Sequence, residues 1–82
     1  AVDFGLAESL DLPELSVDMT PAEALTLAMK KEQMAVEFYH FLAAYTNDEA
    51  VKKLILEMAD MEMSHKRILE NAYIDIAYVE SF

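Results

Sequence analysis

Hydrophobic residues recur every three or four positions through the middle of the chain, which predicts two amphipathic helices. The first should begin at residues 20–23 (Thr-Pro-Ala-Glu), which combine a capping hydroxyl, a proline at the first helical position and a glutamate that completes a capping box. The run 46–49 (Thr-Asn-Asp-Glu) is typical of a turn and offers a second capping box from Thr46 to Glu49. We therefore expect helices over roughly 21–45 and 48–72, made antiparallel by their short connection.

Both predicted helices carry more apolar surface than a two-helix hairpin can cover. At about 100° per residue, the first helix has two apolar stripes on nearly opposite sides. One stripe contains Leu25, Ala28, Met29, Glu32, Ala35, Val36, Tyr39 and Ala43. The other contains Leu27, Met34, Phe38, Phe41 and Tyr45. On the second helix, a broad apolar arc contains Val51, Leu54, Ile55, Met58, Met61, Ile68, Leu69 and Tyr73, with Glu62 and His65 in its middle.

Uncovered apolar surface of this size indicates an interface. The simplest closed arrangement is a second copy of the chain, so the expected fold is an all-α antiparallel two-helix hairpin that dimerises into a four-helix bundle. The length agrees, because a domain of 82 residues buries only about 60% of its unfolded surface. Since the chain has no cysteine, oligomerisation or a bound metal must supply the missing stability.

The chain is strongly acidic, with 16 Asp and Glu against six Lys and Arg and a net charge of −10. This charge excludes nucleic acid and anionic lipid as main partners, because both attract basic surfaces. The longest stretch without Asp, Glu, Lys or Arg, residues 38–47, is far shorter than the ~20 residues that span a bilayer. Residues 1–12 also lack the basic start of a secretory signal, so the expected location is the cytoplasm.

The charge pattern divides the chain into three parts. Residues 1–19 hold five acids and no base, and we expect an acidic tail or a short docking segment there. Residues 20–72 form the hairpin, and residues 73–82 either extend the second helix or form a separate segment. The basic pairs are interpreted as ordinary charges on the helix surface: Lys30-Lys31, Lys52-Lys53 and Lys66-Arg67.

Three polar residues interrupt the apolar positions: Glu32 on the first helix, and Glu62 and His65 on the second. Glu32 lies fifteen residues before Asn47 and Glu62 fifteen residues after it, so an antiparallel hairpin brings them to the same level. His65 follows Glu62 by three positions and shares its face. Carboxylates that meet in a dry interior need a cation. Two hairpins would supply four carboxylates and two imidazoles, a set suited to a pair of iron or manganese ions.

Each of these residues also has a simpler interpretation. Glu32 alone fits a polar position that fixes helix register, and His65 alone fits a core histidine, but their common level with Glu62 favours the metal. Tyr39 shares the face of Glu32 and either hydrogen-bonds a ligand carboxylate or is an aromatic core residue. Four further polar residues fall off these faces. Glu37 and His40 are expected to be solvated or at an outer interface. Glu57 and Asp60 are expected to be solvated, with the lining of an entry route for iron as the alternative.

Two runs of the sequence resemble the rubrerythrin branch of the ferritin-like superfamily. Residues 28–39 are similar to its first-helix motif, in which Glu32 is followed by an alanine three positions later and then by an aromatic pair. Residues 59–69 are similar to its Glu-x-x-His helix, here Glu62 and His65. The resemblance implies a ferritin-like bundle with Glu32, Glu62 and His65 as iron ligands. It also implies oxidation of Fe(II) by oxygen or peroxide at this site.

The chain departs from full-length rubrerythrins in having one hairpin instead of two and no cysteines for a rubredoxin-like electron donor. A single hairpin is similar to encapsulated ferritins, which are two-helix chains that build the di-iron site between subunits. This similarity implies a homodimer or higher homo-oligomer, with a shell protein as partner inside a protein compartment. One alternative is a peroxide-reducing protein with an external donor. Another is a non-catalytic helical interaction module, in which the apolar surface and acidic tails bind a partner.

Overall fold

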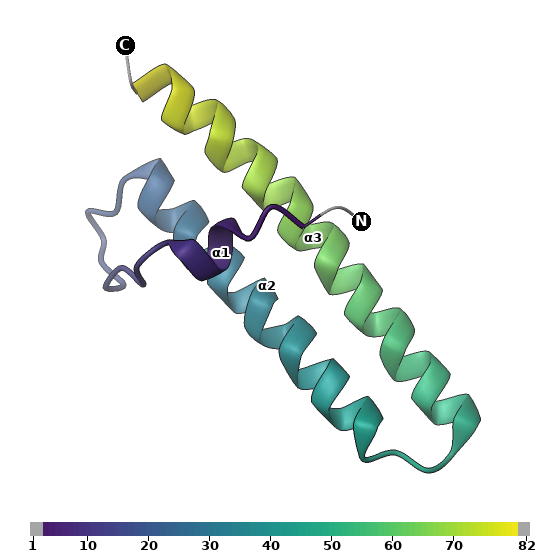
Figure 1. Ribbon diagram of the computed structural model, residues 1–82. Helices are drawn as coiled ribbons and strands as arrows, with labels where there is room; N and C mark the ends of the chain where they lie inside the picture. Colours follow the sequence, from purple (N-terminus) through teal and green to yellow (C-terminus); the bar gives the residue numbers. More distant parts are fainter. Residues whose placement is uncertain (1–2, 81–82) are drawn as a thin grey trace.

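The hairpin predicted from the sequence is the main feature of the structure, a computed structural model. It describes the backbone of residues 3–80 and the side chains of residues 3–78; residues 1–2 and 81–82, the outer ends of the expected tail and C-terminal segment, lie outside the described residues. This part contains three helices and no strand, with α1 over Leu6–Ser9, α2 over Pro21–Ala44 and α3 over Glu49–Glu80. Helices α2 and α3 pack side by side in opposite directions (Figure 1), which confirms the all-α antiparallel hairpin.

The two long helices begin at different kinds of cap. At α2 the Thr20 hydroxyl accepts from the Glu23 amide at 3.1 Å, and the Thr20 amide donates to the Glu23 carboxylate at 3.0 Å, so the first capping box is confirmed. At α3 the Asp48 carboxylate accepts from the Val51 amide at 3.0 Å. The second capping box, from Thr46 to Glu49, is therefore wrong. Thr46 lies too early in the turn, and its hydroxyl instead donates to a carbonyl in the last turn of α2.

Helix α3 continues well past the level at which α2 begins (Figure 1). It has 32 residues against 24 in α2. Of the two alternatives for the C-terminal segment, the structure therefore shows extension of the second helix, through Glu80. No helix in the described part has an apolar stretch long enough to cross a membrane.

The core between α2 and α3 is narrow. Its buried apolar side chains, together with Ala7 of α1, are Met29, Val36, Ala43, Ile55 and Ala59. Many larger apolar side chains are exposed, including Met34, Phe38 and Phe41 on α2 and Val51, Leu54, Met58, Met61 and Ile68 on α3. The expectation that a single hairpin leaves much of its apolar surface uncovered is confirmed.

The N-terminal residues 3–10, here called the N-terminal strap, cross one side of the hairpin (Figure 1). The strap is held by two fully buried charged residues of α3, Lys66 and Glu70. The Lys66 ammonium donates to Glu8 at 2.6 Å and forms an ion pair with Asp3 at 2.9 Å. One Glu70 carboxylate oxygen accepts the Phe4 amide at 3.3 Å, and the other accepts the Leu6 amide at 3.0 Å. The acidic N-terminal residues thus include a docking segment.

The interpretation of Lys66 as an ordinary surface charge is wrong, because the strap covers it completely. Burial alone would lower the pKa of Lys66, but the hydrogen bonds and charges of Glu8 and Asp3 outweigh burial and raise it. The same interaction lowers the pKa of Asp3. Beside this pair, the Arg67 guanidinium lies 3.3 Å from the centroid of the Phe4 ring, a cation–π contact that adds to the docking.

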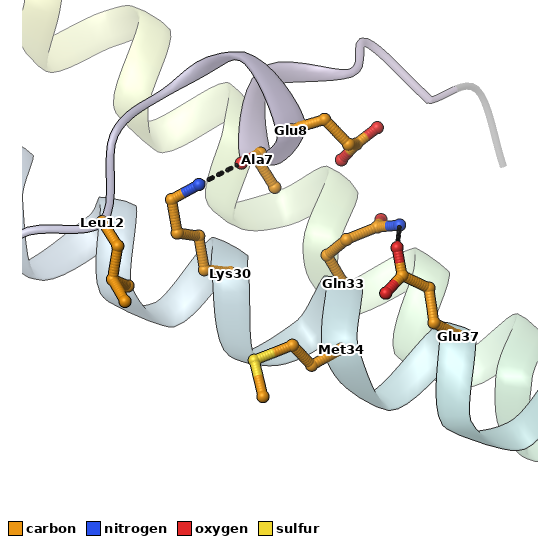
Figure 2. A pocket seen from close by; sticks show the side chains of 7 residues that line it. All are labelled: Ala7, Glu8, Leu12, Lys30, Gln33, Met34 and Glu37. Atoms are coloured by element: carbon orange, nitrogen blue, oxygen red, sulfur yellow. Dashed lines mark hydrogen bonds between the residues drawn. The ribbon is translucent and has the colours of Figure 1, made fainter.

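An open cleft of about 340 Å³ lies between the N-terminal segment and α2 (Figure 2). It is lined by Ala7, Glu8, Leu12, Lys30, Gln33, Met34 and Glu37. The Lys30 ammonium reaches across to the Ala7 carbonyl at 2.7 Å, and the Gln33 amide donates to Glu37 at 2.8 Å. These polar contacts tie the two walls of the cleft to their own neighbours, and none of the predicted ligands lines it.

Candidate metal centre

The three residues singled out from the sequence lie together between α2 and α3. Glu32 projects from α2, and Glu62 and His65 project from neighbouring positions on α3. Each offers one ligand atom, and these atoms all lie within 4.8 Å of one another. The His65 Nδ1 atom is 3.7 Å from Glu32 Oε2 and 3.6 Å from Glu62 Oε2. The prediction that the turn brings Glu32 and Glu62 to one level is confirmed.

The cluster is partly buried and opens to solvent through the histidine. The side chains of Glu32 and Glu62 are 17% and 23% exposed, whereas that of His65 is 50% exposed. Among the described residues, the buried Oε2 atom of Glu32 has no hydrogen-bond partner. The adjacent Glu62 carboxyl group and burial raise the pKa of Glu32, against the weaker opposing charges of His65 and Lys31. The pocket between the helices therefore disfavours a second negative charge.

The sequence matches the family model described as Rubrerythrin over residues 23–81. The chain belongs to the rubrerythrin family. The matched region includes α2 from its third residue, all of α3 and all three clustered residues, so the resemblance carried by the two sequence motifs is confirmed. No curated protein and no solved structure matches the chain.

A rubrerythrin-type domain implies iron, and the donor atoms present fit this metal. Two carboxylates and one imidazole form the mixed oxygen and nitrogen set that suits Fe(II) or Mn(II). The Glu32 oxygen, which has no hydrogen-bond partner within the part of the chain that the structure describes, is an acceptor that a cation would satisfy. A divalent cation would also neutralise the two neighbouring carboxylates, which the protein alone does not. A single hairpin supplies all three of these donor groups.

The sequence analysis missed the residues that fix the two helices beside the cluster. Lys66 and Gln33 directly follow His65 and Glu32 in the sequence, and the Lys66 ammonium donates to the Gln33 side-chain oxygen at 2.5 Å. This bond joins α3 to α2 at the level of the cluster. The spacing of polar residues could have pointed to Lys66. Positions 62, 66 and 70 recur every fourth residue, so Lys66 shares one face of α3 with Glu62.

The other polar residues considered from the sequence lie away from the cluster. Side chains expected to be solvated are exposed, namely Glu37, His40, Glu57 and Asp60. Tyr39 is half-buried, and its ring meets that of Phe38 edge to face at 5.6 Å. Because Phe38 is itself exposed, this contact does not place Tyr39 in the core, and both interpretations of Tyr39 stay predictions.

Proposed function

We propose that the chain binds iron through Glu32, Glu62 and His65 and oxidises Fe(II) with oxygen or peroxide. The observation that carries this proposal is the convergence of the three donors within 4.8 Å, one of which, Glu32, has a buried oxygen with no hydrogen-bond partner in the described part of the chain. Iron supplies one-electron redox chemistry toward oxygen and peroxide, which the side chains alone lack. The same donors bind Mn(II), which makes manganese the alternative metal.

The protein's own groups contribute charge, orientation and a path for the ion. Glu32 and Glu62 balance the positive charge of the metal in a site that water only partly reaches. Because the pKa of Glu32 is raised, binding of the cation also displaces any proton held there. The half-exposed His65 marks the open side, through which Fe(II) and the oxidant enter. A net charge of −10 attracts cations to the surface around this opening.

A non-catalytic helical interaction module is the second candidate, and the large exposed apolar side chains of α2 and α3 favour it. The two functions give different results when ligands are removed. A module should keep its partner and its fold when Glu32 and Glu62 are replaced by apolar residues of similar size. An iron enzyme should lose metal binding and turnover with either replacement.

Anaerobic titration with Fe(II), followed by addition of oxygen, tests the proposal. We expect metal binding and Fe(III) formation in the wild-type protein, and loss of both in Glu32→Ala and Glu62→Ala. The matched control is Glu57→Ala, which removes an exposed glutamate of α3 and should retain wild-type turnover. Unchanged iron oxidation in both ligand variants would refute the proposed function.

A further inference from the structure

The N-terminal strap binds both long helices, and it does so in the turns that carry the metal cluster. On α2 the Lys30 ammonium donates to the Ala7 carbonyl of the strap at 2.7 Å (Figure 2). On α3 the Lys66 ammonium donates to the Glu8 carboxylate of the strap at 2.6 Å. Lys30 lies two positions before the glutamate ligand of α2, and Lys66 directly follows the histidine ligand of α3. The strap therefore joins the two helices at the level of the ligands.

Lys66 extends this connection from the strap into α2. Its buried ammonium has three acceptors, of which Asp3 and Glu8 belong to the strap and the side-chain oxygen of Gln33, at 2.5 Å, belongs to α2. The other end of the Gln33 amide donates to Glu37 at 2.8 Å, so this side chain is held at both ends. Without the strap, one neutral acceptor would remain for the charge of Lys66, and the ammonium would turn toward water instead. The bond between Lys66 and Gln33 thus depends on the strap.

The metal cluster depends on the position of the same two helices. Glu32 projects from α2, and Glu62 and His65 project from α3, so one ion reaches all three only at a particular spacing and rotation of the helices. Gln33 and Lys66 directly follow Glu32 and His65 in the sequence, so a shift of the helices that breaks their bond also moves these two ligands. With the strap docked, His65 is still 50% exposed, so the strap leaves the open side of the cluster free.

We propose that Lys66 and Gln33 are positioning residues that couple docking of the strap to metal binding. The docked strap keeps α2 and α3 at the spacing that the ligands need, and a bound ion in turn favours the docked strap. This inference rests on the proposed iron function. By thermodynamic linkage, the factor by which the strap tightens metal binding equals the factor by which the metal favours docking. We expect a factor of about ten, within the range of roughly 5–150 that is typical of such coupling.

Substitutions in the strap test the effect on metal binding, with Mn(II) as the probe and electron paramagnetic resonance as the measurement. Asp3→Asn/Glu8→Gln removes both acids that meet Lys66 and leaves α2 and α3 unaltered. We expect it to bind Mn(II) about tenfold more weakly, with unchanged helical content and a broader signal from the bound ion because the ligands are less fixed. The matched control Asp11→Asn/Glu14→Gln removes the same charge from exposed residues outside the strap and should bind like the wild type.

Substitutions at Gln33 test the bond between the helices without changing the strap. Gln33→Leu removes the acceptor that Lys66 uses on α2, so it should also weaken Mn(II) binding. Gln33→Glu retains an acceptor oxygen at this position and should restore most of the affinity. A residue that acts only on overall stability would not give this difference between two folded variants.

Hydrogen–deuterium exchange of the strap, followed by mass spectrometry, tests the reverse effect. The Phe4 and Leu6 amides donate to Glu70 when the strap is docked, so their exchange reports its release. In the wild type, saturating Mn(II) should slow exchange of the strap by the same factor of about ten. In Glu32→Met, which lacks a ligand, Mn(II) should leave exchange of the strap unchanged.

Equal Mn(II) affinity of the wild type and Asp3→Asn/Glu8→Gln, with rapid exchange of the strap in the variant, would overturn the coupling. Exchange of the wild-type strap that does not respond to bound Mn(II) would overturn it too. Iron oxidation by the wild type in either case would leave the proposed function standing. A wild-type chain that binds neither Mn(II) nor iron would refute the proposed function, and the coupling with it.

Discussion

We expect Glu32→Met to be more stable than the wild type without metal and less stable than the wild type with metal. The Glu32 side chain is largely buried, and its Oε2 atom has no hydrogen-bond partner among the described residues. A buried polar atom left in this state costs roughly 1–3 kcal/mol. Methionine has a similar length and no polar oxygen. In chelator we expect Glu32→Met to be about 1–2 kcal/mol more stable than the wild type, because the side chain retains some contact with water.

Metal should reverse this order. With free Mn(II) at about 100 times its dissociation constant, a protein that binds one ion gains about 2.7 kcal/mol in its free energy of unfolding. The wild type should gain this amount, and Glu32→Met should gain little because it has lost a ligand. The wild type should then be the more stable by about 1 kcal/mol, or about 4–8 °C in Tm for a domain of this size. Mn(II) serves as the probe because oxygen does not oxidise it rapidly.

The pH dependence in chelator gives a second readout of the same residue. The pKa of Glu32 is raised in the folded protein, chiefly by the Glu62 carboxyl group and then by burial. The contribution of Glu32 to the free energy of unfolding is therefore most favourable at low pH and is lost as pH rises through the folded pKa of Glu32. The advantage of Glu32→Met should be larger at about pH 8 than at about pH 5.

Urea denaturation followed by circular dichroism, at one fixed protein concentration, measures these differences. The control Glu57→Met removes an exposed glutamate and should change stability by no more than about 0.5 kcal/mol in either condition. The reasoning is refuted if Glu32→Met is less stable than the wild type in chelator. It is also refuted if Mn(II) stabilises the variant as much as the wild type.

Three further predictions concern the strap and the turn. Lys66→Met should release the N-terminal strap and speed hydrogen exchange of its amides, measured by NMR, while exchange near Ala43, at the far end of α2, stays unchanged. Continued protection of the strap would contradict this prediction. Acid should release the strap too, because the bond with Lys66 lowers the pKa of Asp3. The contribution of Asp3 to the free energy of unfolding is present above the ordinary aspartate range and disappears as pH falls through the lowered pKa. Asp48→Ala should cost roughly 1 kcal/mol in urea denaturation, and Thr46→Ala should cost less because its hydroxyl does not cap α3.

Local sequence rules were sufficient to predict the hairpin and its cluster. Thr20 and Pro21 define the start of α2 through contacts within one turn of chain, and such contacts do not depend on the rest of the fold. The meeting of Glu32 and Glu62 required only the position of the turn and the constant rise of a helix. An error of one or two residues in the turn, such as the one made at Thr46, leaves that level nearly unchanged.

The strap could not be predicted in the same way, because its contacts with α3 join residues about sixty positions apart. The bond from the Leu6 amide to Glu70 and the pair between Asp3 and Lys66 are tertiary contacts. A basic pair at 66–67 and an acidic N-terminus are each ordinary features of a solvated surface. The excess of acids in residues 1–19 suggested a tail or a docking segment, but it gave neither the side of the hairpin nor the partner of each charge.

The side of α3 under the strap presents Lys66 and Glu70, whose charges are costly to bury unless specific partners meet them. A segment of the same chain supplies those partners: Glu8 and Asp3 for the ammonium, and the Phe4 and Leu6 amides for the carboxylate. The exposed apolar side chains of α3, such as Leu54, Met61 and Ile68, offer no comparable polar groups, so burial there would need shape rather than paired charges. The polar segment 3–10 therefore docks over Lys66 and Glu70 and leaves these apolar side chains uncovered.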